Sequence, residues 1–548
     1  MSNADAIEDI YELTPMQQGM LFHSLLEPGS GMYVEQMSCD VKGDLPLPEW
    51  QAAWQRVVER HPILRSGFVW EGLEKPLQVV ATEAQLQWQV EDLRGLEAAA
   101  QEARIEAFLA ADRVRGFILD TAPLVRCALF RLDGSNHRFV WTYHHLLLDG
   151  WCFSIVLREV LEVVEKGVAS LPPAPRPYRD YIQWLQAQDP AKAEAFWRDE
   201  LLGFSEPTAL PFFGHERGDP AAEAQVVRHL PAELSARLVS YAKEHRLTLN
   251  TLLQGAWALV LGRTADRDDV VFGVTVSGRP ADLPGSEGIV GLFINTVPLR
   301  VRLDEAAPLL EVLGKIQTAQ GAVDGFGFSS LADIQVWSEA PKDQPLFDSL
   351  LVFENYPIDR SALLERSGLE ISGVRTFERT NYSLTVVAIP GDRIELLVMF
   401  DRQNYGRAAA ERIGAMIEGA LRAFASASPE ARLQDFGIMD PTERRALVAW
   451  NQTARAFSVE TLVAERVRAH AKDATAIVEA DGTRLSYREL HRRAQQVAAH
   501  LGALGVGRGG LVGVAIGRSS DFVVAIYGTW LAGGAYVCLL YTSPSPRD

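Results

Sequence analysis

The chain has 548 residues, of which 47% are hydrophobic and 23% charged, and its formal net charge is −18. This length predicts about two to four domains that each bury a core, and the acidic balance argues against nucleic acid as a partner, because phosphate binding needs a basic face. We find no signal peptide and no apolar run of membrane length, so we expect a cytoplasmic protein without a membrane partner. The scattered cysteines and the absence of P-loop, dinucleotide and HExxH patterns favour neither a disulfide framework nor a metal site.

The first clear pattern is a β-hairpin. Residues 125–131 and 138–143 are rich in β-branched and aromatic side chains, and Asp-Gly-Ser-Asn at 133–136 lies between them. Apolar residues then recur at helical spacing over 153–164, with charged residues between them, which predicts an amphipathic helix. The segment 144–150 therefore leaves the end of a strand, where its side chains are expected to line a cleft.

This segment reads His-His-Leu-Leu-Leu-Asp-Gly and combines a titratable base, a carboxylate and a glycine. An arbitrary histidine is more often a satisfied core residue than a functional one. Strand alternation turns His144 away from His145, so a structural, hydrogen-bonded role is expected for His144. The strand end and the Asp-Gly that follows favour a functional role for His145.

Prolines and composition divide the rest of the chain. Four prolines within seven residues cannot continue the preceding helix and predict an extended linker. The end of the chain is rich in proline and serine, and the last unit is too short to form a complete domain. We therefore expect a truncated domain, followed by a tail that is not native sequence. The predicted segments are 1–170, the linker 171–177, 178–440, a second linker 441–455, the last unit 456–537 and the tail 538–548. The predicted elements after the first linker are helices at 232–245, 248–261, 459–471 and 487–504, and strands at 269–276, 384–389, 393–400 and 476–479.

The histidine run is similar to the HHxxxDG signature of the condensation domains of nonribosomal peptide synthetases, which belong to the chloramphenicol-acetyltransferase-like acyltransferases. Further segments resemble other motifs of this family in the right order, and two late segments resemble the first two motifs of an adenylation domain. The resemblance to a condensation domain covers about residues 8 to 450. The segments that resemble condensation motifs are 13–23, 60–68, 178–184, 290–296 and 346–356, and those that resemble adenylation motifs are 485–490 and 531–537.

The resemblance implies an α/β (α+β) fold in which two acetyltransferase-like lobes, 1–170 and 178–440, form a V around a central tunnel. A truncated adenylation fragment at 456–537 would follow, without adenylation activity because the ATP loop is missing. The implied reaction joins a donor acyl or peptidyl thioester to the amine of an acceptor aminoacyl thioester. Both substrates would be carried on phosphopantetheine arms of partner carrier domains, with no cofactor or metal on this chain. The rest of the synthetase module is the other implied partner.

The resemblance also assigns roles around the histidine run. His145 would be the residue that faces the cleft, either as a general base or as a group that orients the amine. Asp149 either caps the following helix or forms a buried ion pair, and the family precedent favours the ion pair, with Arg65 as the expected partner and Arg60 as the alternative.

Further candidate site residues have less support from the pattern. Gly150 is expected either to donate its amide to an oxyanion or to give the substrate room through a backbone free to adopt positive φ. Asn295 is a candidate side-chain donor in the same cleft, with a turn residue as the alternative, and Trp151 is a second candidate for substrate binding.

Other functions remain open at this stage. A freestanding HHxxxDG acyltransferase is disfavoured by the adenylation-like continuation, and an epimerisation domain would not normally precede an adenylation start. A cyclisation domain is also disfavoured, because the cyclising relatives replace the histidines with aspartates. A carrier-binding scaffold without catalysis is disfavoured by the intact His145, Asp149 and Gly150. The opening motif and the Gly-Trp pair favour an L-configured donor weakly.

Overall fold

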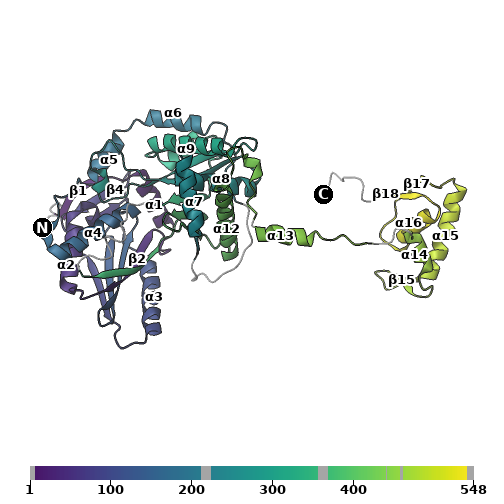
Figure 1. The fold of residues 1–548 in the computed structure, drawn as a ribbon, viewed down its shortest axis with the longest axis horizontal. Coiled ribbons are helices and arrows are strands. Elements are labelled where there is room, and N and C mark those ends of the chain that lie inside the picture. The colour runs from purple at the N-terminus through teal and green to yellow at the C-terminus, as the bar shows by residue number, and fades with distance from the viewer. Residues whose placement is uncertain (1–5, 211–223, 356–367, 440, 457–460, 540–548) are drawn as a thin grey trace. The chain divides into compact units, whose positions relative to one another are not determined.

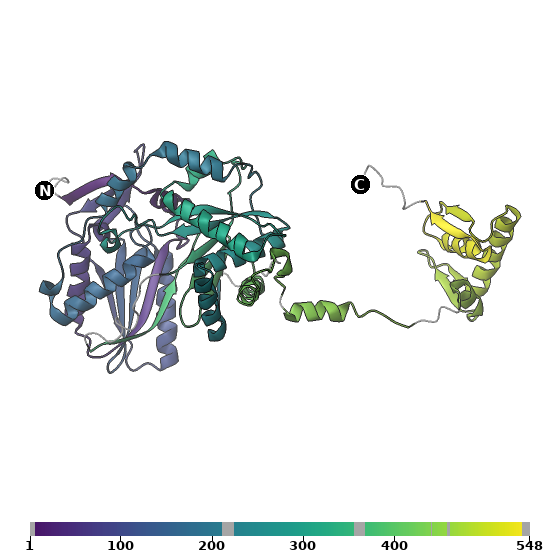
Figure 2. The ribbon, with the colours of Figure 1, turned by 45° about the horizontal axis from the view of Figure 1, so that its top comes forward.

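The computed structural model describes residues 6–210, 224–355, 368–439, 441–456 and 461–539. The chain divides into two compact units, Met1–Arg444 and Arg445–Asp548, and both mix helices with strands (Figures 1 and 2). No helix among these residues is both long and apolar enough to cross a membrane.

The first lobe of the large unit is built on a five-stranded sheet of order β12-β2-β7-β6-β5. Side chains alternate across it: Phe139 and Trp141 pack on one face with α2 and α4, whereas Phe130 and Val140 pack on the other face beside α3. The predicted hairpin and the predicted helix after it are confirmed. The elements are β2 (Val34–Lys42), α2 (Leu47–Arg60), β5 (Gln87–Asp92), α3 (Ala98–Arg115), β6 (Val125–Asp133), β7 (Asn136–His144), α4 (Gly150–Lys166) and β12 (Glu370–Phe377).

A smaller three-stranded sheet of order β1-β4-β3 completes this lobe beside helix α1. Thr14 caps α1 in a reciprocal capping box with Gln17, which fixes where the helix begins. These elements are β1 (Ile7–Glu12), α1 (Pro15–Leu26), β3 (Ser66–Val69) and β4 (Leu77–Ala81).

The second lobe is built on a six-stranded mixed sheet of order β10-β9-β11-β13-β14-β8. Helix α8 is buried along nearly its whole length, as its almost continuous apolar sequence requires, and it contacts α7, α9, α12 and the sheet. The helices are α6 (Pro190–Glu200), α7 (Ala232–Glu244), α8 (Leu249–Ala265), α9 (Leu309–Gly325), α10 (Leu331–Trp337) and α12 (Arg407–Phe424), whereas α5 (Arg179–Gln186) packs in the first-lobe core. The strands are β8 (Gln225–His229), β9 (Asp269–Val276), β10 (Asn295–Arg302), β11 (Ser349–Phe353), β13 (Leu384–Ile389) and β14 (Glu395–Phe400).

Strand β12 departs from the prediction that all of 178–440 belongs to the second lobe. It leaves the second lobe, pairs antiparallel with β2 of the first lobe, and returns to the second lobe in β13. Ile371 is 5% exposed and packs in the first-lobe core. The physical reason for the pairing is that β2 would otherwise be an unpaired edge of the sheet.

The second unit has its own small core, formed by Leu490, Ala494, Val524 and Tyr527. Cys538, predicted to begin the tail, ends β18, and residues 540–548 lie outside the described residues. The elements here are α13 (Pro441–Trp450), α14 (Val463–Ala469), β15 (Thr475–Val478), β16 (Arg484–Ser486), α15 (Tyr487–Ala503), β17 (Leu511–Val514), α16 (Ser520–Leu531) and β18 (Ala535–Cys538).

Candidate active site

A cavity of about 810 Å³ lies between the two lobes of the large unit. Helix α1, strand β2 and the loop after β7 line it from the first lobe, and β10, β11 and the segment after β12 complete the wall. His145, Gly150 and Asn295 all line this cavity. The structure therefore brings three of the predicted site residues to one space.

His145 is held in a defined orientation at the end of β7. Its backbone N–H donates to the carbonyl oxygen of Tyr33 at 2.9 Å, and its Nδ1 lies 2.5 Å from the carbonyl oxygen of Leu148. A carbonyl oxygen only accepts, so Nδ1 carries the ring proton and donates it. The neutral ring then has its acceptor lone pair on Nε2, as a group that takes a proton from a substrate requires.

His144 is buried elsewhere. It is 2% exposed, its Nδ1 accepts the Leu146 backbone N–H at 3.2 Å, and its Nε2 lies 3.4 Å from the Ser24 hydroxyl. Burial lowers the pKa of His144 to about 3, and the neighbouring His145 contributes in the same direction. These contacts hold a neutral imidazole beneath the loop, outside the cavity lining.

Asp149 caps α4 and also ties the loop to the segment 279–293, which follows β9 in sequence and packs in the first-lobe core. Its Oδ1 accepts the Cys152 backbone N–H at 3.3 Å, and its Oδ2 accepts the Phe293 backbone N–H at 3.0 Å. The guanidinium of Arg279 lies 3.4 Å from Oδ1, and both side chains of this ion pair are buried. Arg279 is itself held by the carbonyl oxygens of Ser286 and Ile289. The loop shape thus depends on the segment 279–293.

The predicted partner of Asp149 is wrong. Arg65 instead binds Glu8 at 2.7 Å and the carbonyl oxygens of Ala81 and Thr82. Arg60 pairs with Glu159 at 3.1 Å. Both arginines sit on the first lobe and satisfy groups there, whereas the Arg279 guanidinium approaches Asp149 from a segment 130 residues away in sequence.

Three further predictions meet different outcomes. Gly150 is the first residue of α4 and is not among the glycines with positive φ, so the fold does not use the conformational freedom expected of this glycine. The side-chain amide of Asn295 donates to the carbonyl oxygens of Gly327 and Ser329, at 2.8 and 2.7 Å. Trp151 packs with its ring 5.6 Å from the guanidinium carbon of Arg279 and is not among the residues that line the cavity.

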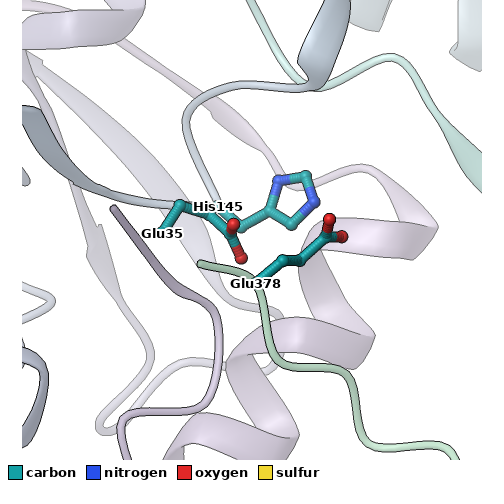
Figure 3. A group of neighbouring side chains, drawn as sticks. All are labelled: Glu35, His145 and Glu378. Carbon is teal, nitrogen blue, oxygen red and sulfur yellow. The ribbon is translucent and has the colours of Figure 1, made fainter. Parts of the chain in front are cut away.

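Two glutamates that the sequence did not single out lie beside His145. Glu35 projects from β2 and Glu378 directly follows β12 (Figure 3). Glu35 lies within the buried run Val34–Cys39 of β2, but this strand also carries Gln36 and Ser38, so no local pattern in the sequence sets Glu35 apart. Nothing local points to Glu378, because its position depends on the β12 pairing.

Comparison with known families agrees with this architecture. A condensation-domain model matches residues 7–448, and an AMP-binding-enzyme model matches residues 463–547. The chain is 43% identical to one of the linear gramicidin synthase subunits of Brevibacillus parabrevis, covering 99% of this chain and 7% of that protein. It is 34% identical to surfactin synthase subunit 3 of Bacillus subtilis strain 168, covering 97% of this chain and 42% of the relative. The chain thus spans less than half of either relative.

Solved structures share the fold. A holo four-domain nonribosomal peptide synthetase, AB3403, aligns with a TM-score of 0.77 at 19% identity, over 98% of this chain and 42% of that one. The first condensation domain of the calcium-dependent antibiotic synthetase, in complex with a substrate analogue, aligns with a TM-score of 0.64 at 19% identity, over 79% of this chain and all of that one. The chain therefore belongs to the condensation-domain family of nonribosomal peptide synthetases, and a partial AMP-binding region follows that domain.

Proposed function

We propose that this chain joins a donor acyl or peptidyl thioester to the amine of an acceptor aminoacyl thioester, with His145 as the residue that receives the amine. The observation that carries the proposal is the orientation of His145. Its Nδ1 is engaged by Leu148, which leaves Nε2 as an acceptor in a ring that lines the cavity between the lobes.

The thioester is already activated, so most of the acceleration comes from holding both substrates in line. The lone pair of the amine attacks the thioester carbonyl carbon, and His145 accepts a hydrogen bond or a proton from the nitrogen as its charge rises. A positioned base contributes typically about 10²–10⁴-fold. The start of α4 at Gly150 lies on the same cavity, where the positive end of the helix favours negative charge on the former carbonyl oxygen.

Asp149 and Arg279 act on this chemistry through the loop. Their ion pair, together with the Asp149 to Phe293 hydrogen bond, fixes the loop that carries His145 against the segment 279–293. In this proposal both are positioning residues. Asn295 has both amide hydrogens engaged within the protein, so its role is to shape the cavity wall rather than to donate to substrate.

The proposed partners are two carrier domains, which bring the substrates on phosphopantetheine arms, and the remainder of a synthetase module. The family match and the curated synthetase relatives support this proposal. A cytoplasmic location follows from the same proposal, because the reaction consumes carrier-bound thioesters.

The test uses the full chain with two carrier proteins, one bearing an acyl or aminoacyl donor and the other bearing an amino acid acceptor. Mass spectrometry of the acceptor arm should show a gain equal to the donor acyl group. The variant His145→Ala should reduce this rate by about 10²–10⁴-fold while the melting temperature stays near that of the wild type. Carrier binding without transfer by the wild type would replace the proposal with a scaffold function, and full turnover by His145→Ala would remove His145 from the mechanism.

A further inference from the structure

Two carboxyl groups converge on the imidazole of His145. One ligand atom from each of Glu35, His145 and Glu378 lies within 4.8 Å of the other two. Figure 3 shows the three side chains turned toward one another, with Glu35 on β2 and Glu378 on the segment after β12. Both glutamates line the cavity in which the reaction is proposed to occur.

Glu35 is in an unusual state for a buried acid. It is 6% exposed, and its Oε1 has no hydrogen-bond partner among the described residues. Burial raises the pKa of Glu35 well above its ordinary value, and the negative charges of Glu378 and Glu354 raise it further. A buried carboxylate without a partner is costly. A raised pKa makes the Glu35 carboxylate a strong proton acceptor once it is deprotonated, and a cation bound beside it favours that deprotonated form.

The acceptor substrate of the proposed function brings such a cation. An α-amino group has an ordinary pKa of about 7.7–8.0, so it arrives mainly as an ammonium ion at neutral pH. Its three N–H bonds match the acceptors that converge here: the two carboxylates and the Nε2 lone pair of His145. An opposite charge between two carboxylates also relieves their mutual repulsion.

An ammonium nitrogen has no lone pair and cannot attack. It must lose one proton before the C–N bond forms and a second proton afterwards, as the tetrahedral intermediate becomes an amide. When the C–S bond breaks, the leaving sulfur takes up one of these protons, and the other passes to solvent. The reaction thus asks for two proton acceptors at the nitrogen, whereas the histidine supplies one.

We propose that Glu35 is the second proton acceptor of this site and that Glu35 and Glu378 together bind the acceptor ammonium beside His145. The inference rests on the proposed condensation function and deepens it. Glu35 takes the first proton and frees the lone pair, and His145 takes the second proton after the C–N bond has formed. Glu378, at the end of β12, supplies the other half of the ammonium site.

The experiment compares two acceptors that differ in one atom. The acceptor carrier is loaded with β-alanine, whose amine is protonated at pH 7, or with aminooxyacetic acid, in which oxygen replaces the CH₂ next to nitrogen and keeps the nitrogen neutral. Rates are measured by mass spectrometry for the wild type, Glu35→Gln and Glu378→Gln. The control is Glu370→Gln. Glu370 begins β12, the strand that Glu378 directly follows, but it is exposed and pairs with Lys42 at 3.6 Å.

With β-alanine, Glu35→Gln should lower the rate by about 10²-fold or more, the range of a lost general base. With aminooxyacetic acid the loss should be less than about 10-fold, because this nitrogen needs no initial deprotonation. Glu378→Gln should follow the same direction with a smaller loss. Glu370→Gln should stay within about twofold on both acceptors, as expected of an exposed pair.

Equal losses on both acceptors would assign Glu35 a structural role and overturn the inference, as would wild-type rates in Glu35→Gln. Activity that a chelator abolishes and Zn²⁺ restores would place a metal ion rather than an ammonium between the carboxylates, and would also overturn it. Failure of the wild type on both acceptors, while ordinary aminoacyl acceptors react, would count against ammonium capture at this site. Failure of the wild type on every acceptor would instead count against the proposed function, and the inference would fall with it.

Discussion

Asp149 is paired with Arg279, a residue 130 positions away in sequence, and the energy of this contact can be measured. Removing either side chain leaves a buried partner without its counter-charge, so Asp149→Ala and Arg279→Ala should each cost about 3–5 kcal/mol of unfolding free energy. In a double-mutant cycle measured by urea denaturation, the pair should show a coupling of about 0.5–3 kcal/mol.

The matched control for this cycle is Arg65→Ala. Arg65 is also buried and hydrogen-bonded, but its partners are Glu8 and nearby carbonyl groups. Its coupling with Asp149→Ala should be within about 0.5 kcal/mol of zero. A coupling as large as that of Arg279 would restore the partner expected from the sequence.

His144 makes stability depend on pH. Its folded pKa of about 3 lies below the unfolded value of about 6.5, so its contribution is fully present above pH 6.5 and is lost as the pH falls toward 3. Between pH 7.5 and 4.5 the loss from this residue should be roughly 3 kcal/mol. His144→Asn, which keeps an acceptor for the Leu146 amide, should remove that part of the slope in paired urea titrations. An unchanged slope would mean that His144 becomes protonated in the folded protein.

At the scale of elements, β12 should stabilise the first lobe although it follows most of the second lobe in sequence. Ile371 packs in the first-lobe core, so Ile371→Ala should cost about 2–4 kcal/mol of unfolding free energy. Val374 on the same strand is 48% exposed, and Val374→Ala should stay within about 0.5 kcal/mol. Equal effects in chemical denaturation would show that β12 is not packed as described.

The sequence predicts those elements that depend on local interactions and misses those that depend on contacts between distant segments. The β6–β7 hairpin, helix α4 and strands β9 and β13 were predictable because turn residues and periodic apolar side chains act locally. The pairing of β12 with β2 has no local signature, because it joins segments that lie far apart in sequence. The same limit hid Arg279 and Glu378, because both reach the site through tertiary packing.

At the scale of the whole molecule, the two units have cores of very different size. The second unit contains a cluster of four buried side chains, whereas each lobe of the first unit buries dozens. Burial of apolar surface is the main source of stability, so α15 and α16 should lose hydrogen-exchange protection at lower urea than α8 or β7. The proposed amide formation should persist at the urea concentration at which α15 and α16 have lost protection but α8 and β7 have not. Simultaneous loss of protection in both units would show that they unfold as one.

The path of β12 has a practical consequence for recombining synthetase parts. A hybrid that exchanges only residues 1–170 would keep the recipient's strand at the edge of a foreign sheet, with mismatched side chains against β2 and a displaced glutamate beside His145. Transplanting residues 1–170 together with 370–378 would carry the native partner strand and its carboxylate as one set, so an exchange unit for this chain is discontinuous in sequence.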